Sequence, residues 1–239
     1  MSGPRDGFSA GRRAAAWGVH LLTASSAPAG LLAILATLHG DARTAFLWMS
    51  YTVAIDAIDG TLARAVRVKE VLPFVDGSRL DDIVDYFTYV AVPAFFIVHM
   101  GLLPGAVAVP VASLVLLASG YGFSQVAAKT ADHFFTGFPS YWNVVAFYLY
   151  VLGWPPALNA AVVTTLAVLV FVPLRYLYPS RMTELRAPTI GLGLVWGAAI
   201  LWALANFDSA PRGVLTWSLL YPAYYFGLSL YFQVRRAAD

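Results

Sequence analysis

The sequence has no cysteine and few charged residues. Without cysteine, the chain has no disulfide, no thiolate nucleophile and no metal site with sulfur ligands. Charged side chains make up 12% of its 239 residues, whereas a soluble protein carries about 25%. Because 59% of the residues are apolar, too little charge remains to cover a water-exposed globule. The net charge of +2 is also too small to favour nucleic acid, and we expect no such partner.

Long apolar segments instead predict a membrane protein. A helix needs about 20 apolar residues to cross the hydrocarbon core of a bilayer. Breaks at polar, proline and glycine residues leave about eight candidate spans, at 20–38, 44–64, 80–100, 106–128, 141–152, 155–177, 188–207 and 213–231. The sequence therefore predicts an all-α, polytopic integral membrane bundle that forms a single domain over residues 1–239.

The basic residues are distributed unequally between the two sides of this predicted bundle. With eight spans, 13 of the 15 basic residues lie on the side of both termini, and only Arg43 and Arg212 lie opposite. Cytoplasmic loops carry the excess of Lys and Arg, so we expect both termini and the opening of the site to be cytoplasmic. Arg12 and Arg13 before an apolar run resemble a secretory signal, but the run continues to Leu38, so we expect an uncleaved first helix.

Seven of the thirteen acidic residues fall between positions 56 and 85, partly inside predicted spans. A carboxylate within a membrane is costly and therefore suggests a functional site. On a helix, Asp56 and Asp59 share one face, and Asp81 and Asp85 share a face of the next helix. Two such helices, with small residues beside the carboxylates, can form an oxygen cage for Mg²⁺ or Mn²⁺ that a phosphate-bearing ligand can approach.

Three other interpretations of the acidic residues remain open. The carboxylates could neutralise Arg64, Arg67 or Arg79, or they could line a cation pathway of a transporter. The segment 81–85 also matches the Asp-Asp-x-x-Asp pattern of polyprenyl-diphosphate enzymes. That pattern leaves the small residues of the preceding helix unexplained.

The acidic residues form a longer motif with their neighbours. In order, it comprises Asp56, Asp59, Gly60, Ala63 and Arg64, then, after twelve residues, Gly77, Asp81 and Asp85. This pattern resembles the motif of the CDP-alcohol phosphotransferases, membrane enzymes of phospholipid synthesis whose core has six helices. The gap is longer than is common in that family. The gap and the segments 68–73 and 128–143 resemble the bacterial branch that uses free choline as its acceptor.

The resemblance implies transfer of a phosphatidyl group from CDP-diacylglycerol to choline, with release of CMP. Serine, inositol or glycerol phosphate are the alternative acceptors within the family. The resemblance also implies Mg²⁺ or Mn²⁺, with two ions expected, held by Asp56, Asp59 and Asp81. Asp85 is expected to be the general base and a ligand of the second ion. The implied CDP pocket consists of Asp59, Gly60, Ala63, Arg64 and Gly77.

The remaining expected contacts rest on residue type and position. A quaternary ammonium group binds aromatic faces, so Tyr86 and Tyr89, beside Asp85, are candidate choline contacts. Lys129 and Arg181 are candidate contacts for lipid phosphate near the inner face. A homodimer is expected by analogy with the family. The four histidines show no spacing typical of ligands and receive no role.

Overall fold

The computed structural model describes residues 7–125, 134–179, 182–207 and 209–238. Within these residues, helices form almost all of the regular structure, in agreement with the predicted all-α membrane bundle. Among the described residues, four helical segments are long and apolar enough to span a membrane, at Ala10–Leu38, Gly77–His99, Gly105–Ser124 and Arg186–Ala205. Two shorter apolar helices cover Trp142–Leu152 and Pro156–Leu169.

The first span begins ten residues earlier than the sequence predicted. Helix α1 (Ala10–Ala24) starts after Ser9, whose hydroxyl accepts a hydrogen bond from the Arg12 amide at 3.3 Å. Helix α2 (Ser26–Leu38) follows after an interruption at Ser25. The predicted start at position 20 was wrong because Ser9 caps the helix upstream, before the run becomes continuously apolar.

Helix α3 (Ala42–Val66) returns alongside α2 and carries the first half of the acidic motif. Asp41 caps its first turn by accepting a hydrogen bond from the Thr44 amide at 2.9 Å. Arg67, in a left-handed conformation with φ 60°, ends the helix and leads into the short helix α4 (Val68–Val71). The twelve residues between Arg64 and Gly77 therefore hold the end of α3, the α4 turn and the Asp76 cap of the next helix.

The second half of the motif opens a continuous helical segment. Helix α5 (Gly77–Asp85) runs into a π-helical stretch, η1 (Tyr86–Ala91), and then into α6 (Val92–His99). A π-helical stretch shifts the side chains that follow it relative to an α-helix and is often found at functional sites. Helix α7 (Gly105–Ser124) then contacts η1 and α6.

The second half of the chain adds α8 (Trp142–Leu152), α9 (Pro156–Leu169), α10 (Arg186–Ala205), α11 (Arg212–Ser218) and α12 (Leu220–Ala238). The predicted sixth span at 155–177 was too long, because its helix ends at Leu169 and Arg175–Leu177 forms strand β2. Pro173 cannot continue a helix. Strand β2 pairs antiparallel with β1 (Phe134–Thr136), and its Arg175 amide donates to Gln233 of α12 at 3.1 Å.

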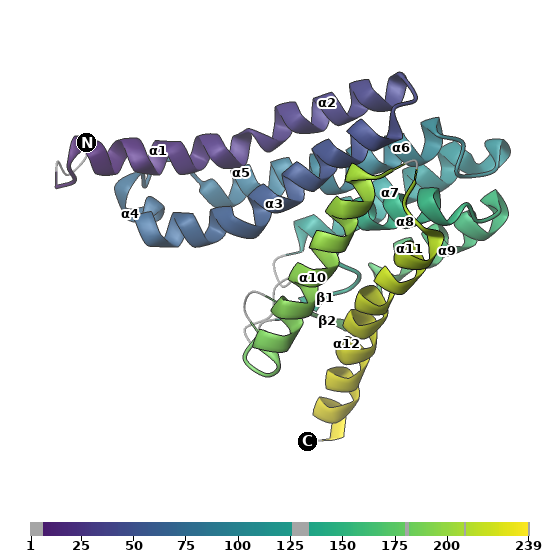
Figure 1. Ribbon diagram of the computed structural model, residues 1–239. Coiled ribbons are helices and arrows are strands. Elements are labelled where there is room, and N and C mark those ends of the chain that lie inside the picture. The colour runs from purple at the N-terminus through teal and green to yellow at the C-terminus, as the bar shows by residue number, and fades with distance from the viewer. Residues whose placement is uncertain (1–6, 126–133, 180–181, 208, 239) are drawn as a thin grey trace.

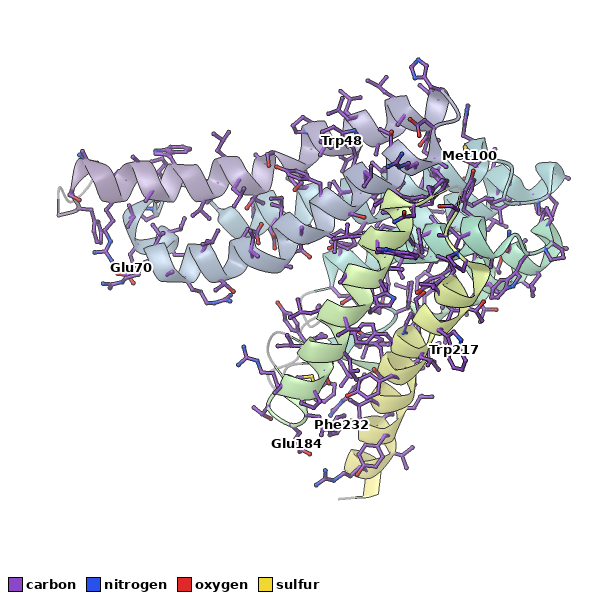
Figure 2. The ribbon with its side chains drawn as sticks, viewed as in Figure 1. Trp48, Glu70, Met100, Glu184, Trp217 and Phe232 are labelled. Carbon is purple, nitrogen blue, oxygen red and sulfur yellow. The ribbon has the colours of Figure 1, made fainter. Side chains whose placement is uncertain are left out.

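The helices form two arms that meet near one end of the molecule (Figure 1). Helices α1 to α5 extend along one arm, and α10 and α12 lead along the other, with β1 and β2 beside them. Figure 2 shows Glu70 at the end of the first arm and Glu184 at the end of the second. Where the arms meet, the Arg43 guanidinium donates to the carbonyl of Leu204 at 2.9 Å. The acidic motif therefore lies in the arm that begins the chain.

Candidate active site

Three carboxylates of the motif come together between α3 and α5. Asp56 of α3 and Asp81 and Asp85 of α5 each offer an oxygen, and these oxygens lie within 4.8 Å of one another. All three residues are half-buried. We call these residues the carboxylate group. Like charges this close repel one another, so a bound cation would stabilise the arrangement.

Asp59 takes a different position from the three residues of the carboxylate group. It lies one turn after Asp56 and is only 5% exposed. Its carboxylate accepts a hydrogen bond from the Thr23 hydroxyl of α1 at 2.7 Å. The motif therefore joins α1 to α3 as well as α3 to α5, and the expected role of Asp59 as a metal ligand stays a prediction.

Two small residues of the motif on α3, Gly60 and Ala63, have different neighbours. A methyl group placed on Gly60 would lie 3.3 Å from Nη1 of Arg64, so the guanidinium lies along the Gly60 face of α3. The other guanidinium nitrogen of Arg64, Nη2, donates to Thr61 at 2.9 Å. Ala63 instead packs against the apolar cluster of α1 and α4. Arg64 is exposed and lies beside Gly60, so these two residues offer a surface for a phosphate.

Gly77 is the first residue of α5, and it packs against His20, a histidine to which the sequence assigned no role. A methyl group on Gly77 would lie 2.8 Å from Cε1 of His20 in α1. The His20 side chain is buried, and its Nε2 has no hydrogen-bond partner among the described residues. We call His20, Thr23, Asp59 and Gly77 the α1 cluster. The sequence signal for it was weak: two polar residues three positions apart in a mostly apolar helix.

The two candidate choline tyrosines face different neighbours. The Tyr89 hydroxyl donates to Asp56 at 2.8 Å, so Tyr89 adjoins the carboxylate group. The Tyr86 hydroxyl donates to the backbone carbonyl of Leu116 at 2.9 Å, and its ring lies 5.8 Å from that of Phe123. Tyr86 therefore anchors η1 to α7.

Two tyrosines from the second half of the chain extend the aromatic surface beside Tyr89. The ring centroids of Tyr89 and Tyr141 are 6.3 Å apart, and those of Tyr141 and Tyr225 are 6.1 Å apart. These residues come from η1, from the residue before α8 and from α12. Because the three positions are far apart in sequence, residue spacing gave no signal for this contact.

Similar proteins were found by comparison of the full sequence, although no protein-family model matches the chain. A phosphatidylcholine synthase from Legionella pneumophila is 41% identical over 224 residues, covering 91% of this chain and 88% of the relative. A phosphatidylcholine synthase from Pseudomonas aeruginosa is 41% identical and covers 77% of each chain. One from Rhizobium johnstonii is 33% identical and covers 91% of this chain and 90% of the relative.

The chain belongs to the phosphatidylcholine synthase family. This assignment confirms the resemblance that the motif and its long gap predicted. The apolar helices and the bacterial relatives together identify a bacterial membrane protein. The polyprenyl-diphosphate interpretation loses its support, since these relatives are named phosphatidylcholine synthase.

Two arginines near the motif, Arg67 and Arg79, have acidic partners outside the carboxylate group. Arg67 forms an ion pair with Glu70, and Arg79 lies 3.3 Å from Asp76. The interpretation that these two arginines neutralise the motif carboxylates is therefore not supported. The predicted lipid-phosphate contacts Lys129 and Arg181 lie outside the described residues.

Proposed function

We propose that this protein transfers the phosphatidyl group of CDP-diacylglycerol to choline, giving phosphatidylcholine and CMP. The observation that carries the proposal is the identity of 41% over 91% of the chain with a phosphatidylcholine synthase. The convergence of Asp56, Asp81 and Asp85 supports it from the structure. A lone motif match would not distinguish choline from serine, inositol or glycerol phosphate.

The carboxylate group fits a hard divalent cation. Mg²⁺ and Mn²⁺ bind oxygen ligands, and three carboxylate oxygens within 4.8 Å of one another provide such a donor set. We propose that Asp56, Asp81 and Asp85 hold the metal, that Asp59 contributes when the donor is bound, and that two ions bind. A metal ion bound there would neutralise negative charge on the diphosphate and on the leaving CMP.

Asp85 is proposed as the general base. The choline hydroxyl is a weak nucleophile at neutral pH, so its proton must leave as the oxygen attacks. The choline oxygen bonds to the phosphorus that bears diacylglycerol, the bond from that phosphorus to the CMP oxygen breaks, and Asp85 accepts the hydroxyl proton. General base catalysis typically contributes about 10²- to 10⁴-fold in rate.

The rest of the motif is proposed to hold the CDP moiety. Gly60 and Gly77 lack side chains and admit the ligand, and Ala63 adds little bulk. The planar guanidinium of Arg64 can donate two hydrogen bonds to phosphate oxygens. Its position beside the Gly60 face supports this role, since both groups would meet the same ligand. Asp59 completes the pocket from its buried position.

Tyr89 is the better supported of the two choline contacts. Its hydroxyl is bonded to Asp56, which places the ring next to the proposed reaction centre. A trimethylammonium group has no hydrogen to donate, so it is attracted to the negative face of an aromatic ring. Tyr86 uses its hydroxyl on α7, so its proposed contribution is limited to its ring.

We further propose a site that opens to the cytoplasm of the bacterial cell, in an inner-membrane protein with both termini on that side. The basic residues of the predicted inner face support this orientation. Lys129 and Arg181 would contact lipid phosphate there, and a homodimer is expected. Reporter fusions to the C-terminus would locate that end, and crosslinking in membranes would give the number of chains.

Purified protein provides the test of the activity. It is incubated with Mn²⁺, CDP-diacylglycerol and, separately, choline, serine, inositol or glycerol phosphate, and CMP release is measured. The proposal predicts release with choline and formation of phosphatidylcholine. If CMP is released only with serine, inositol or glycerol phosphate, that alcohol is the acceptor in place of choline. Mn²⁺ flux into liposomes without any CMP release would favour a transporter.

A further inference from the structure

His20 occupies an unusual position for a histidine in a membrane helix. Its side chain is 7% exposed, and its ring lies against α5 where Gly77 has no side chain. The ring of Trp17 meets it edge-on, with centroids 6.1 Å apart. Its Nε2 is buried and without a partner among the described residues. A buried polar atom is rarely left without a hydrogen bond, so this nitrogen calls for an explanation.

The neighbours of His20 connect it to the proposed CDP pocket. Thr23, three residues along the same face of α1, donates to Asp59 at 2.7 Å. Gly77 lies one helical turn before Asp81, a member of the carboxylate group. A ligand that lies between the Gly77 face and the carboxylates therefore meets the imidazole of His20 at its edge.

The chemistry of the imidazole suits a nucleotide diphosphate. A protonated ring nitrogen donates a hydrogen bond, and non-bridging phosphate oxygens accept such bonds strongly because they are charged. The carboxylate group would repel the same diphosphate, so a hydrogen-bond donor from α1 would offset part of that repulsion. A purely apolar ring would fill the Gly77 notch equally well, without the cost of burying Nε2.

We infer that His20 is a further residue of the CDP-diacylglycerol site, and that its Nε2 donates a hydrogen bond to the diphosphate of this substrate. This inference rests on the proposed function for the identity of the nucleotide. It gives α1, which lies before the acidic motif, a direct part in holding the ligand. It also explains why residue 77 is a glycine, because a methyl group there would lie 2.8 Å from the imidazole.

Two variants of His20 and one matched control test the inference. His20→Phe keeps a planar ring against Gly77 and removes the ring nitrogens, whereas His20→Gln keeps an amide donor. His39→Ala is the control, because His39 is exposed at the end of α2 and bonds only its own helix at Leu35 in the described structure. Full-length protein in detergent with Mn²⁺ is titrated with CDP, and the KM values for CDP-diacylglycerol and choline are measured in parallel.

The expected result is a selective loss of affinity for CDP and CDP-diacylglycerol. His20→Phe should weaken CDP binding and raise the KM for CDP-diacylglycerol by about 10- to 100-fold, the size of one hydrogen bond to a charged group. The KM for choline and the affinity for Mn²⁺ should stay close to those of wild type. His20→Gln should recover part of the loss, and His39→Ala should bind CDP normally. Wild-type CDP affinity in both His20 variants would overturn the inference and leave His20 a packing residue.

A second measurement follows His20 in the wild-type protein and uses a variant only to assign its resonances. In wild-type protein with isotope-labelled histidine, CDP should shift the ring-nitrogen resonances of His20, which His20→Gln assigns, and leave those of His39 and His99 unchanged. Unshifted His20 resonances at saturating CDP would contradict the inference. If wild-type protein binds CDP through His20 but makes no phosphatidylcholine, the acceptor assignment fails and the inference stands. If wild-type protein binds no CDP, both fail.

Discussion

The carboxylate group and the α1 cluster share the same acidic motif but differ in how they are built. The carboxylate group brings like charges within 4.8 Å and leaves them half-buried. The α1 cluster buries a single carboxylate, Asp59, against the Thr23 hydroxyl, and it packs the buried His20 imidazole against Gly77. The first arrangement suits a cation, and the second suits a ligand with acceptor oxygens. The comparison suggests that one linear motif serves two tasks, metal binding and donor recognition.

The largest effect should come from the carboxylate group. Asp85→Asn keeps the shape of the side chain and removes the base, so turnover should fall by about 10²- to 10⁴-fold while the protein inserts and folds normally. CMP release measures the effect. Asp82→Asn is the matched control, because Asp82 is the exposed neighbour of Asp81 and lies outside the group. Equal activity in the two variants would remove Asp85 as the base.

Smaller effects should distinguish the α1 cluster from the carboxylate group, because variants of the two should change different kinetic parameters. Thr23→Val removes the hydrogen bond to buried Asp59, a loss of about 1.5–3 kcal/mol, and should raise the KM for CDP-diacylglycerol about tenfold or more. Tyr89→Phe removes the hydroxyl bonded to Asp56 and should change Mn²⁺ affinity and kcat instead. Thr37→Val is a control, since its buried hydroxyl bonds only the Ala33 carbonyl in the described structure. The same pattern of changes in both test variants would mean that the regions act as one.

A double-mutant cycle between Gly77 and His20 should give an effect on stability. The added methyl of Gly77→Ala would lie 2.8 Å from the His20 ring, and such overpacking costs about 1–3 kcal/mol. In a His20→Ala background, thermal unfolding in detergent should show that this cost largely disappears. CDP binding should stay weak in the double variant, because the imidazole donor is gone. Wild-type CDP binding in the double variant would contradict a hydrogen bond from His20 to the diphosphate.

The smallest effect is expected at the far end of α3, away from both regions. The hydrogen bonds from the side chain and amide of Thr44 lower the pKa of Asp41, the cap of that helix. Asp41→Ala should reduce stability by about 1 kcal/mol at neutral pH. Because the folded pKa is depressed, this stabilisation is complete above the unfolded pKa of about 3.9 and is lost as pH falls through the folded value. A variant whose stability deficit is unchanged in acid would contradict this origin.

The sequence predicted that Asp56, Asp59, Asp81 and Asp85 meet, because they lie on two helices joined by a short connection. The structure brings three of them together, and the carboxylate of Asp59 bonds Thr23 of α1 instead. Helical spacing alone placed Asp81 and Asp85 on one face, and the structure brings Asp56 to them. His20, Tyr141 and Tyr225 could not be found in this way, because their contacts join helices distant in sequence. The strand at Arg175–Leu177 was missed for a related reason, since its backbone partners come from β1 and α12. Composition gave the membrane environment but not these tertiary contacts.

Binding of Mn²⁺ tests most directly whether the carboxylate group is a metal site. Electron paramagnetic resonance of the purified protein, titrated with Mn²⁺ in the presence of CDP, would count the bound ions. We predict saturable binding to wild type, and binding at least tenfold weaker in Asp81→Asn, which loses one of three closely spaced charged ligands. Asp82→Asn should bind Mn²⁺ as wild type does. Undiminished Mn²⁺ binding in Asp81→Asn would contradict a metal site between α3 and α5.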